Sequence, residues 1–283
     1  MCAWYAGSYE CAADTELQWA VQTVDGQWGR IESIRPFAGY GVGNPVLDWN
    51  PVTRALTIYF SVVAGTWWTD ALLLAMASQD SGTTWERPHL LMPTRGLMAR
   101  TSVVHVKNGT VLLPIYHEQY RVPLVLLSTD QGKTWEMTGD TTMFGHAIQP
   151  AVVELPDDTL AMFTRTDKGF VYVSYSFNHG KSWTMSQPTA LPNPNSSIAA
   201  VCLHDGAVLM ALNPSDYSRD TLALATSRDG GVTWSEPETI VHKPHAEYSY
   251  PAMQQMPHGL LHLVFTENRA RILHGVFTPG RLD

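Results

Sequence analysis

Several features that mark other classes of protein are scarce or missing. Cysteine occurs only three times, at Cys2, Cys11 and Cys202, an odd number without metal-ligand spacing. We therefore expect free thiols, and neither a metal site nor a cofactor. No apolar run approaches the roughly twenty residues of a transmembrane helix, which argues against membrane insertion. The formal net charge of -8 argues against a general nucleic-acid surface, although a local arginine cluster can still attract an anion.

Helical periodicity is also missing, and instead one short motif recurs along the chain. Ser-x-Asp-x-Gly-x-Thr-Trp occupies residues 78–85, 128–135 and 227–234. The copy at 176–183 has Asn in place of Asp and Ser in place of Thr, and residues 23–28 form an eroded copy. The copies recur about every fifty residues, a period typical of repeat architectures.

The motif is interpreted as a structural turn and not as a catalytic element. Its Asp can accept backbone hydrogen bonds inside the turn, and its Gly permits a positive φ. Its Trp begins the next strand, where we expect the indole ring to pack beneath the sheet with its N–H bonded.

Between the motifs lie short apolar runs rich in β-formers, separated by Asn-Gly, Asp-Asp or Asp-Gly turns. Four antiparallel strands per repeat is typical of a propeller blade. The sequence therefore predicts an all-β fold, a six-bladed β-propeller of four-stranded blades forming one domain over residues 1–283, with a five-bladed ring as the variant. The first blade should begin at its second strand, which we interpret as truncation, and the last should lack its outer strand.

Segments between the motifs carry a more specific resemblance. With NPVLDWN, GLMARTSVV, HAIQPAVVEL, LPNPNSSIAAV and EYSYPAMQQ, the chain resembles the sialidase (neuraminidase) superfamily, in its BNR-repeat-like branch, over nearly its whole length. This implies an active site on the propeller axis, where arginines clamp a substrate carboxylate, a Tyr activated by Glu is the nucleophile, and an Asp is the acid/base. Planar guanidinium groups suit a carboxylate, and sialidases are the Tyr exception among retaining glycosidases.

The resemblance is carried to individual positions of this chain. Arg165 and Arg219 correspond to two clamp arginines, and Arg100, Arg269 and Arg271 are further candidates. Tyr250 is favoured over Tyr248 as the nucleophile, and two residues apart on an extended segment they should share a face. The remaining candidates are Glu247 or Glu267 to polarise the tyrosine, Asp14 or Asp48 as acid/base, and Asn195 and Asn193 as ligands or turn formers.

Departures from the sialidase pattern leave two alternatives open. Gln149 stands where sialidases have the Glu that activates Tyr, and an amide cannot act as a base. Glu10 stands where they carry a basic residue. One alternative is a lyase that removes the C5 proton of a uronic acid, with His117 or His146 as base, since a His pKa suits proton transfer. The other is a sugar-binding propeller that has lost catalysis.

The expected function is thus that of an exo-acting, sialidase-like glycoside hydrolase on an acidic sugar. The expected partner is a carbohydrate, and the oligomeric state is left open. No signal peptide precedes Trp4, so we expect a soluble, cytoplasmic protein, or a secreted or periplasmic one if a signal peptide lies upstream.

Overall fold

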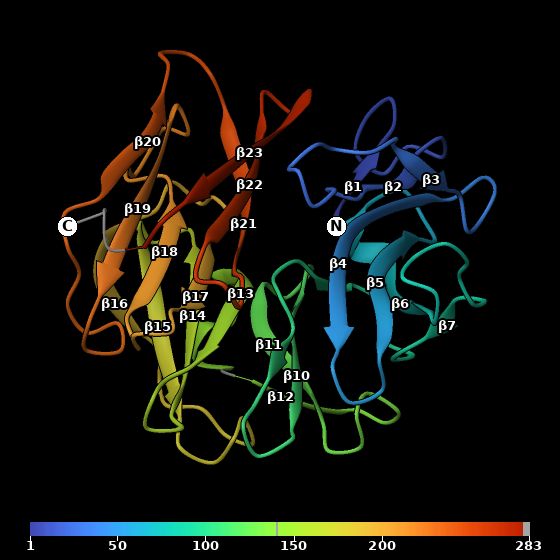
Figure 1. The fold of residues 1–283 in the computed structure, drawn as a ribbon. Coiled ribbons are helices and arrows are strands. Elements are labelled where there is room, and N and C mark those ends of the chain that lie inside the picture. Colours follow the sequence, from blue (N-terminus) through green and yellow to red (C-terminus); the bar gives the residue numbers. More distant parts are fainter. Residues whose placement is uncertain (140, 280–283) are drawn as a thin grey trace.

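The computed structural model describes residues 1–139 and 141–279 as six antiparallel sheets placed around a common centre (Figure 1). The helical elements of the described chain are two single 3-10 turns, η1 (Trp68–Asp70) and η2 (Thr141–Met143). The predicted all-β, six-bladed propeller is confirmed.

The sheets follow one another in chain order. The strands of the first three are β1 (Cys2–Ala6), β2 (Glu16–Ala20) and β3 (Glu32–Ile34); β4 (Gly41–Asn50), β5 (Ala55–Val63), β6 (Ala71–Ser78) and β7 (His89–Leu90); and β8 (Leu97–Ala99), β9 (Val104–His105), β10 (Val111–His117), β11 (Val122–Ser128) and β12 (Glu136–Gly139). Those of the last three are β13 (Ala147–Glu154), β14 (Leu160–Thr166), β15 (Phe170–Ser176) and β16 (Gln187–Pro192); β17 (Ala199–Cys202), β18 (Val208–Leu212), β19 (Thr221–Ser227) and β20 (Glu238–His242); and β21 (Tyr248–Gln255), β22 (Leu261–Glu267) and β23 (Arg271–Phe277).

The two end sheets are three-stranded, as predicted. In the complete sheets the motif joins the third strand to the fourth, and the eroded copy at 23–28 joins β2 to β3 in the same way. β1 therefore corresponds to a second strand. In the last sheet β21 holds the innermost position, and β23 is the third strand.

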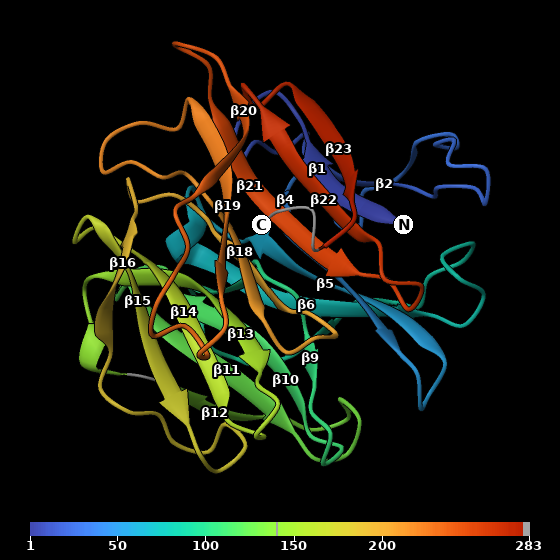
Figure 2. The same cartoon turned by 60° about the vertical axis from the view of Figure 1, so that its left-hand side comes forward.

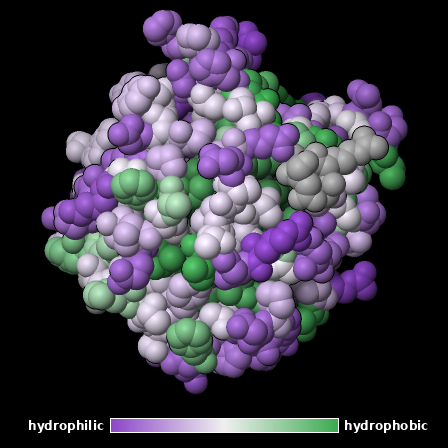
Figure 3. Space-filling view, turned by 90° about the vertical axis from the view of Figure 1, so that its left-hand side faces the viewer, coloured by the Kyte–Doolittle hydropathy of each residue, from purple (hydrophilic) through white to green (hydrophobic). Residues whose placement is uncertain are grey.

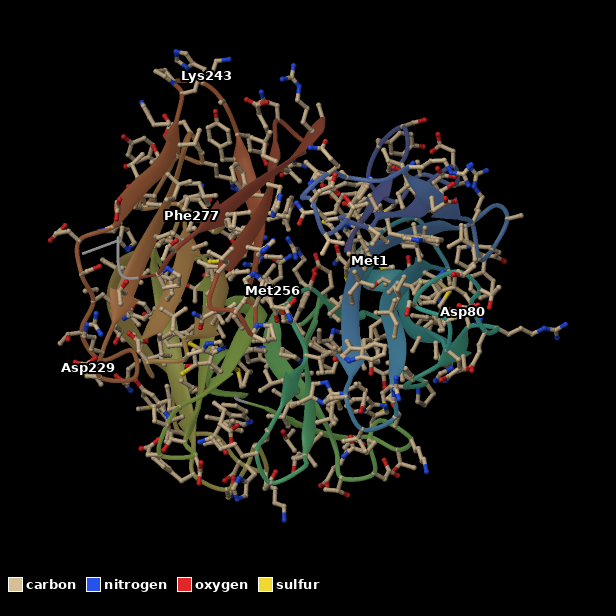
Figure 4. All side chains as sticks on the ribbon, in the orientation of Figure 1. Met1, Asp80, Asp229, Lys243, Met256 and Phe277 are labelled. Carbon is tan, nitrogen blue, oxygen red and sulfur yellow. The ribbon has the colours of Figure 1, made fainter. Side chains whose placement is uncertain are left out.

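Each complete motif closes its turn through its carboxylate. Oδ1 of Asp229 accepts hydrogen bonds from Ser227 Oγ and Thr233 N, each at 2.8 Å. These bonds, with those from Thr233 Oγ1 and the backbone, outweigh desolvation and lower the pKa of Asp229 to about 2. Asp80 and Asp229 both lie on the outer rim of the molecule, away from the centre (Figure 4). This supports the structural interpretation of the motifs.

The tryptophan of each motif packs against the preceding sheet. Trp234 meets Phe163 of β14 edge-on, with ring centroids 5.6 Å apart, and Trp135 and Trp85 meet aromatic rings of their preceding sheets in the same way. Only Trp234 among the four donates its indole N–H, to Gly231 O at 3.0 Å. The buried indole nitrogens of Trp85, Trp135 and Trp183 have no partner within the described chain, so the prediction of a bonded N–H is wrong for these three. The rings act by packing between blades.

The ring closes between its last and first sheets by the same type of contact. Trp28, from the eroded motif, lies edge-on to His274 of β23, with centroids 5.2 Å apart. His274 Nε2 in turn lies 3.0 Å from His262 Nδ1. In both ribbon views β1 lies beside the last sheet (Figures 1 and 2).

The core lies between neighbouring sheets. The largest apolar cluster combines β13–β15 with β17–β19, and its Phe163, Met210 and Leu212 are fully buried. The outside is mostly hydrophilic where the left side of Figure 1 faces the viewer, with small, separated apolar areas (Figure 3). Among the described residues, no helix has the length and apolar character needed to cross a membrane.

Candidate active site

Backbone irregularities bring polar side chains to the propeller axis. Three innermost strands have a register shift at a non-glycine residue of positive φ that precedes a proline, namely Asn44 in β4, Gln149 in β13 and Tyr250 in β21. Asn195, just before β17, also has a positive φ. Such a residue costs about 1–3 kcal/mol, and bulges of this kind re-aim side chains next to functional sites.

The innermost strand of the third sheet is interrupted at the same level. It is split into β8 and β9, which pair separately with β10, and Arg100 lies in the gap. The guanidinium of Arg100 lies over the ring of Tyr250, with Cζ 5.2 Å from the ring centroid, although these residues come from the third and sixth sheets. A cation over a partly desolvated aromatic face contributes roughly 0.5–2 kcal/mol.

Arg165, at the end of β14, is held by two side-chain amides. Its Nε donates to Asn195 Oδ1 at 2.9 Å, and its Nη1 donates to Gln149 Oε1 at 3.0 Å. Gln149 is almost fully buried, with 6% of its surface exposed, and its amide oxygen holds the guanidinium in place. These bonds use the Nε–H and one N–H of Nη1, two of the five guanidinium donors.

A second chain of contacts joins the fifth, sixth and first sheets. Arg219 donates from Nη2 to Asn195 O at 2.7 Å and lies 3.4 Å from Glu247 Oε1. Arg269 donates to the same Glu247 oxygen at 3.1 Å and reaches Glu10 Oε1 at 2.7 Å. Glu10 therefore faces the axis with its charge balanced by Arg269.

We call these residues the axial cluster. It consists of Glu10, Arg100, Gln149, Arg165, Asn195, Arg219, Glu247, Tyr250 and Arg269. The second sheet also contributes, since Trp68 Nε1 donates to Glu10 Oε2 at 3.3 Å. All six sheets thus supply a side chain at one place.

Two carboxyl groups near the axis have pKa values shifted in opposite directions. Burial raises the pKa of Glu118, and the charges of Arg165 and Arg121 only partly oppose it. Burial would also raise the pKa of Glu247, but the hydrogen bond from Ser249 and the charge of Arg269 outweigh it and lower that pKa. Carboxyls with separated pKa values can divide the roles of acid and base.

The inner strands also border a small cavity next to the cluster. A cavity of about 20 Å³ is lined by Thr101, Ala151, Ala199 and Pro251 among others, which follow the cluster residues on their strands. That volume is about the size of a single water molecule.

Two predicted catalytic residues lie outside the cluster because of the bulge at Tyr250. Tyr248 is 2% exposed and packs against Phe265, and its phenol lies beside Glu267. Glu267 in turn pairs with Arg271 at 3.5 Å, an arginine that is largely exposed. The prediction that Tyr248 and Tyr250 share a face is wrong, because the register shift between Ser249 and Ala252 breaks the alternation.

The two predicted aspartates are also placed elsewhere. Asp14 is exposed and accepts hydrogen bonds from Ser8, and these bonds lower its pKa. Asp48 is buried near the other end of β4, 2.7 Å from His105. Neither aspartate contacts the cluster, so neither position supports the acid/base role. The residue of the β1–β2 loop that reaches the axis is Glu10.

The histidines and Asn193 have local partners. His117 is 9% exposed, burial lowers its pKa, and its Nδ1 accepts from Tyr120 N at 3.4 Å. His146 lies 3.1 Å from Asp167. Asn193 is buried and bonds both N and O of Ser196, as a turn former does. Within the described residues, no group of three His, Cys, Asp or Glu side chains is placed to hold a metal ion, and the three cysteines are free.

Sequence reasoning missed Glu118, Tyr5 and Tyr116. The two phenols are buried near Arg100 and Tyr250. Glu118 directly follows His117 in the segment IYHE, and its place at a strand end was the available signal.

Comparison with known proteins agrees with the fold. Residues 1–263 match the family model of the BNR repeat-like domain. A sialidase of Bacteroides fragilis is 22% identical over 278 residues, which cover 84% of this chain and 49% of the relative, so the chain spans about half the length of that curated relative.

Solved structures superpose closely at low identity. A Hadza microbial sialidase has a TM-score of 0.82 and 18% identity, covering 97% of this chain and 61% of its own. The intramolecular trans-sialidase of Ruminococcus gnavus has a TM-score of 0.81 and 14% identity, covering 98% and 90%. A protein of unknown function from Dyadobacter fermentans has a TM-score of 0.73 and 16% identity, covering 96% and 85%. The chain belongs to the BNR repeat-like family, in the sialidase superfamily.

Proposed function

We propose that this protein is a sialidase-like glycoside hydrolase that releases an acidic sugar from the end of a glycan. The observation that carries the proposal is the convergence of Arg100, Arg165 and Arg269 on Tyr250 from three different sheets, with Arg219 of a fourth sheet held beside Arg165 through Asn195. A neighbour of the same fold, the R. gnavus intramolecular trans-sialidase, was solved in complex with oseltamivir carboxylate, a carboxylate ligand.

In this proposal Arg165 and Arg219 bind the sugar carboxylate. Both guanidinium groups are positioned through Asn195, by its side chain and its backbone carbonyl respectively. A guanidinium has five N–H donors, so those not used in these bonds can be presented to a carboxylate. Glu10 does not oppose binding strongly, because Arg269 neutralises it.

Tyr250 is the proposed nucleophile. Its phenol oxygen attacks the anomeric carbon, and its proton passes to the ionised Glu247, which shares Arg269 as a neighbour with Tyr250. Glu118, whose pKa is raised by burial, is the proposed acid that protonates the leaving glycosidic oxygen. In the second step Glu118 takes a proton from the water that cleaves the sugar–tyrosine bond, and Tyr250 recovers its proton from Glu247.

The structure gives little support to the lyase alternative. His117 is buried against Tyr120, and His146 is paired with Asp167, so neither is placed as a base in the cluster. Gln149, which replaces the sialidase Glu, acts in this proposal as a positioning residue for Arg165.

The proposal is tested with a fluorogenic sialoside. Wild-type protein should release the fluorophore, and Tyr250→Phe should lose at least about a thousandfold in kcat, the scale of a missing nucleophile. The ring that Arg100 covers is kept in this variant, so binding of the free acidic sugar should change little. Tyr217→Phe is the matched control, because Tyr217 is 88% exposed. Sugar binding without any turnover by the wild type would instead identify a binding protein.

A further inference from the structure

A groove between the third and fourth sheets is not used by the proposed chemistry. Its volume is about 360 Å³, within the range of small-molecule sites. Three turns surround it, namely the turn between β9 and β10, the motif turn at 128–135 and the Asn-containing motif turn at 176–183. We call it the motif groove, and the polar residues that line it are Asn108, Thr110, Thr129, Gln131, His179 and Lys181.

The motif groove is separate from the axial cluster. β11 runs from Val122 to Ser128, and the groove is lined by Leu127 and Thr129, at the Ser128 end of this strand. Glu118, which lies near the cluster, precedes the other end of the strand. A strand of seven residues spans roughly 20 Å, so a ligand in the groove does not contact the cluster.

Hydrogen bonds between neighbouring turns hold the walls of the groove. Gln131 Nε2 donates to Gly109 O at 3.1 Å, and Gln131 Oε1 accepts from Asn50 Nδ2 of the second sheet at 3.2 Å. Thr138 Oγ1 of β12 donates to Gly180 O at 2.6 Å, which fixes the Asn-containing turn to the third sheet. A preformed site binds a ligand with little ordering cost.

The Asn-containing motif lacks a negative charge at the place where the groove is built. Asn178 still closes the turn, since its Oδ1 accepts from Ser182 N at 2.9 Å and its Nδ2 donates to Ser182 Oγ at 2.8 Å. The three regular motifs have at this position an ionised Asp with a pKa of about 2. His179 and the exposed Lys181 therefore line the groove without the usual carboxylate in their own turn.

Hydrogen-bond donors predominate among the groups that the groove can offer to a ligand. Asn108 Oδ1 already accepts from Thr110 N at 2.9 Å, which leaves the Nδ2 group of this amide as a donor. The hydroxyl of Thr129 and the ammonium of Lys181 add O–H and N–H groups. No Asp or Glu is among the described residues that line the groove. The lining therefore suits a ligand that accepts hydrogen bonds and carries negative charge.

The acidic residues around the groove are bonded to partners of their own. Asp158, which lies in the field of His179, accepts from Lys107 Nζ at 2.7 Å. Asp130, in the neighbouring motif, accepts from Thr134 N at 2.9 Å and from Thr134 Oγ1. Nδ1 of His179, in contrast, is buried without a hydrogen-bond partner in the described chain, which is rare for a polar atom.

We propose that the motif groove binds a small molecule bearing an oxyanion, which is a carboxylate, phosphate or sulfate group, with Lys181 as its charged contact. The oxyanion accepts hydrogen bonds from Lys181, Asn108 and Thr129, and bonds between an ion and a charged donor are the stronger kind. The volume leaves room for a ring or a short chain attached to the charged group. Binding here does not depend on the proposed hydrolysis, because the two sites lie at opposite ends of the strands.

The test compares four ligands that share one hexose framework, namely glucose 6-phosphate, glucose 6-sulfate, glucuronic acid and glucose. Binding is followed by nuclear magnetic resonance of the isotope-labelled protein, through the backbone amides of Gly109, Gly180 and Lys181. At least one of the three anions should shift these amides in a saturable way, and the anion that does so identifies the charged group. Glucose at the same concentration should leave them in place. Equal shifts with glucose, or no shift of these amides with any ligand, would overturn the proposal.

Two variants test the charge of the groove. Lys181→Gln should weaken anion binding about two- to fivefold, the scale of one exposed ion pair. Asn178→Asp restores the regular motif and should weaken binding by a similar factor, without lowering the melting temperature. Lys133→Gln is the matched control, because Lys133 has the same position in the neighbouring motif and does not line the groove. Unchanged binding in both test variants, or an equal loss in the control, would contradict the assignment.

Discussion

Replacing Arg165 with Lys tests how the cluster recognises its ligand. Arg165 uses Nε and Nη1 for Asn195 and Gln149, at 2.9 and 3.0 Å, and in our proposal offers its remaining N–H groups to the sugar carboxylate. One ammonium cannot serve both amides and a carboxylate in the same geometry. A hydrogen bond to a charged group contributes about 1.5–3 kcal/mol, so the variant should bind an acidic sugar roughly tenfold to 150-fold more weakly.

The assay is calorimetric titration with N-acetylneuraminic acid and with its carboxamide, which has the same shape without the charge. The carboxamide should lose less than about threefold, because it never formed the charged contact. Arg30→Lys is the control, since Arg30 is exposed and pairs with the nearby Glu32. Equal losses for the acid and the carboxamide would refute the carboxylate clamp.

Three further predictions concern stability. Asp229→Asn should lower the melting temperature by a few degrees at pH 6. Because the pKa of Asp229 is depressed to about 2 in the folded protein, its ionised form stabilises the fold above pH 3.8, and this stabilisation is lost as the pH falls towards about 2. The difference in melting temperature between wild type and variant should therefore vanish over that range, and a difference that persists at pH 2 would contradict this. Burial and neighbouring histidines lower the pKa values of His262 and His274 below 6.5. The neutral histidine pair therefore stabilises the closed ring above pH 6.5, and this stabilisation is lost on acidification. His274→Gln should flatten the fall in melting temperature between about pH 7 and 5. Phe163→Ala removes a fully buried ring and should cost about 3–5 kcal/mol in the free energy of unfolding, measured by denaturant titration. A cost under about 1 kcal/mol would show that the contact between Phe163 and Trp234 does not stabilise the packing of these two sheets.

The fold was predictable because its signals are local. The turn chemistry of Asp80, Asp130 and Asp229 is contained within each motif, and the three carboxylates make the same set of hydrogen bonds. The fixed period then requires only that like units pack side by side. The eroded copy also kept its role, since Trp28 packs across the seam as the other motif tryptophans do across theirs.

The site was predictable in part. Arg100, Arg165, Arg219, Arg269 and Tyr250 do converge, because strand ends of a propeller meet at its axis. Side-chain direction was harder to predict, since one bulge decides whether Tyr248 or Tyr250 faces the axis. Proton-donor candidates were misplaced for a similar reason, because the hairpin between β1 and β2 directs Glu10 inwards and leaves Asp14 to bond Ser8.

The strand-end position of Glu118 was visible in the sequence, but its shifted pKa was not. Burial and the charge of Glu10 raise its pKa, and the charge of Arg165 opposes the rise; both of these residues are remote in the chain. Its proposed role as proton donor predicts that Glu118→Gln slows release of a sugar with a poor leaving group much more than release of a sugar with a good aryl leaving group, as measured by steady-state kinetics.

The most direct test of the account is a crystal structure of the Tyr250→Phe protein soaked with an acidic sugar. We predict that the sugar lies on the propeller axis, with its carboxylate within hydrogen-bond distance of Arg165 and Arg219 and its anomeric carbon facing the ring at position 250. A sugar bound with its carboxylate turned away from these arginines, or bound only elsewhere on the protein, would contradict the account.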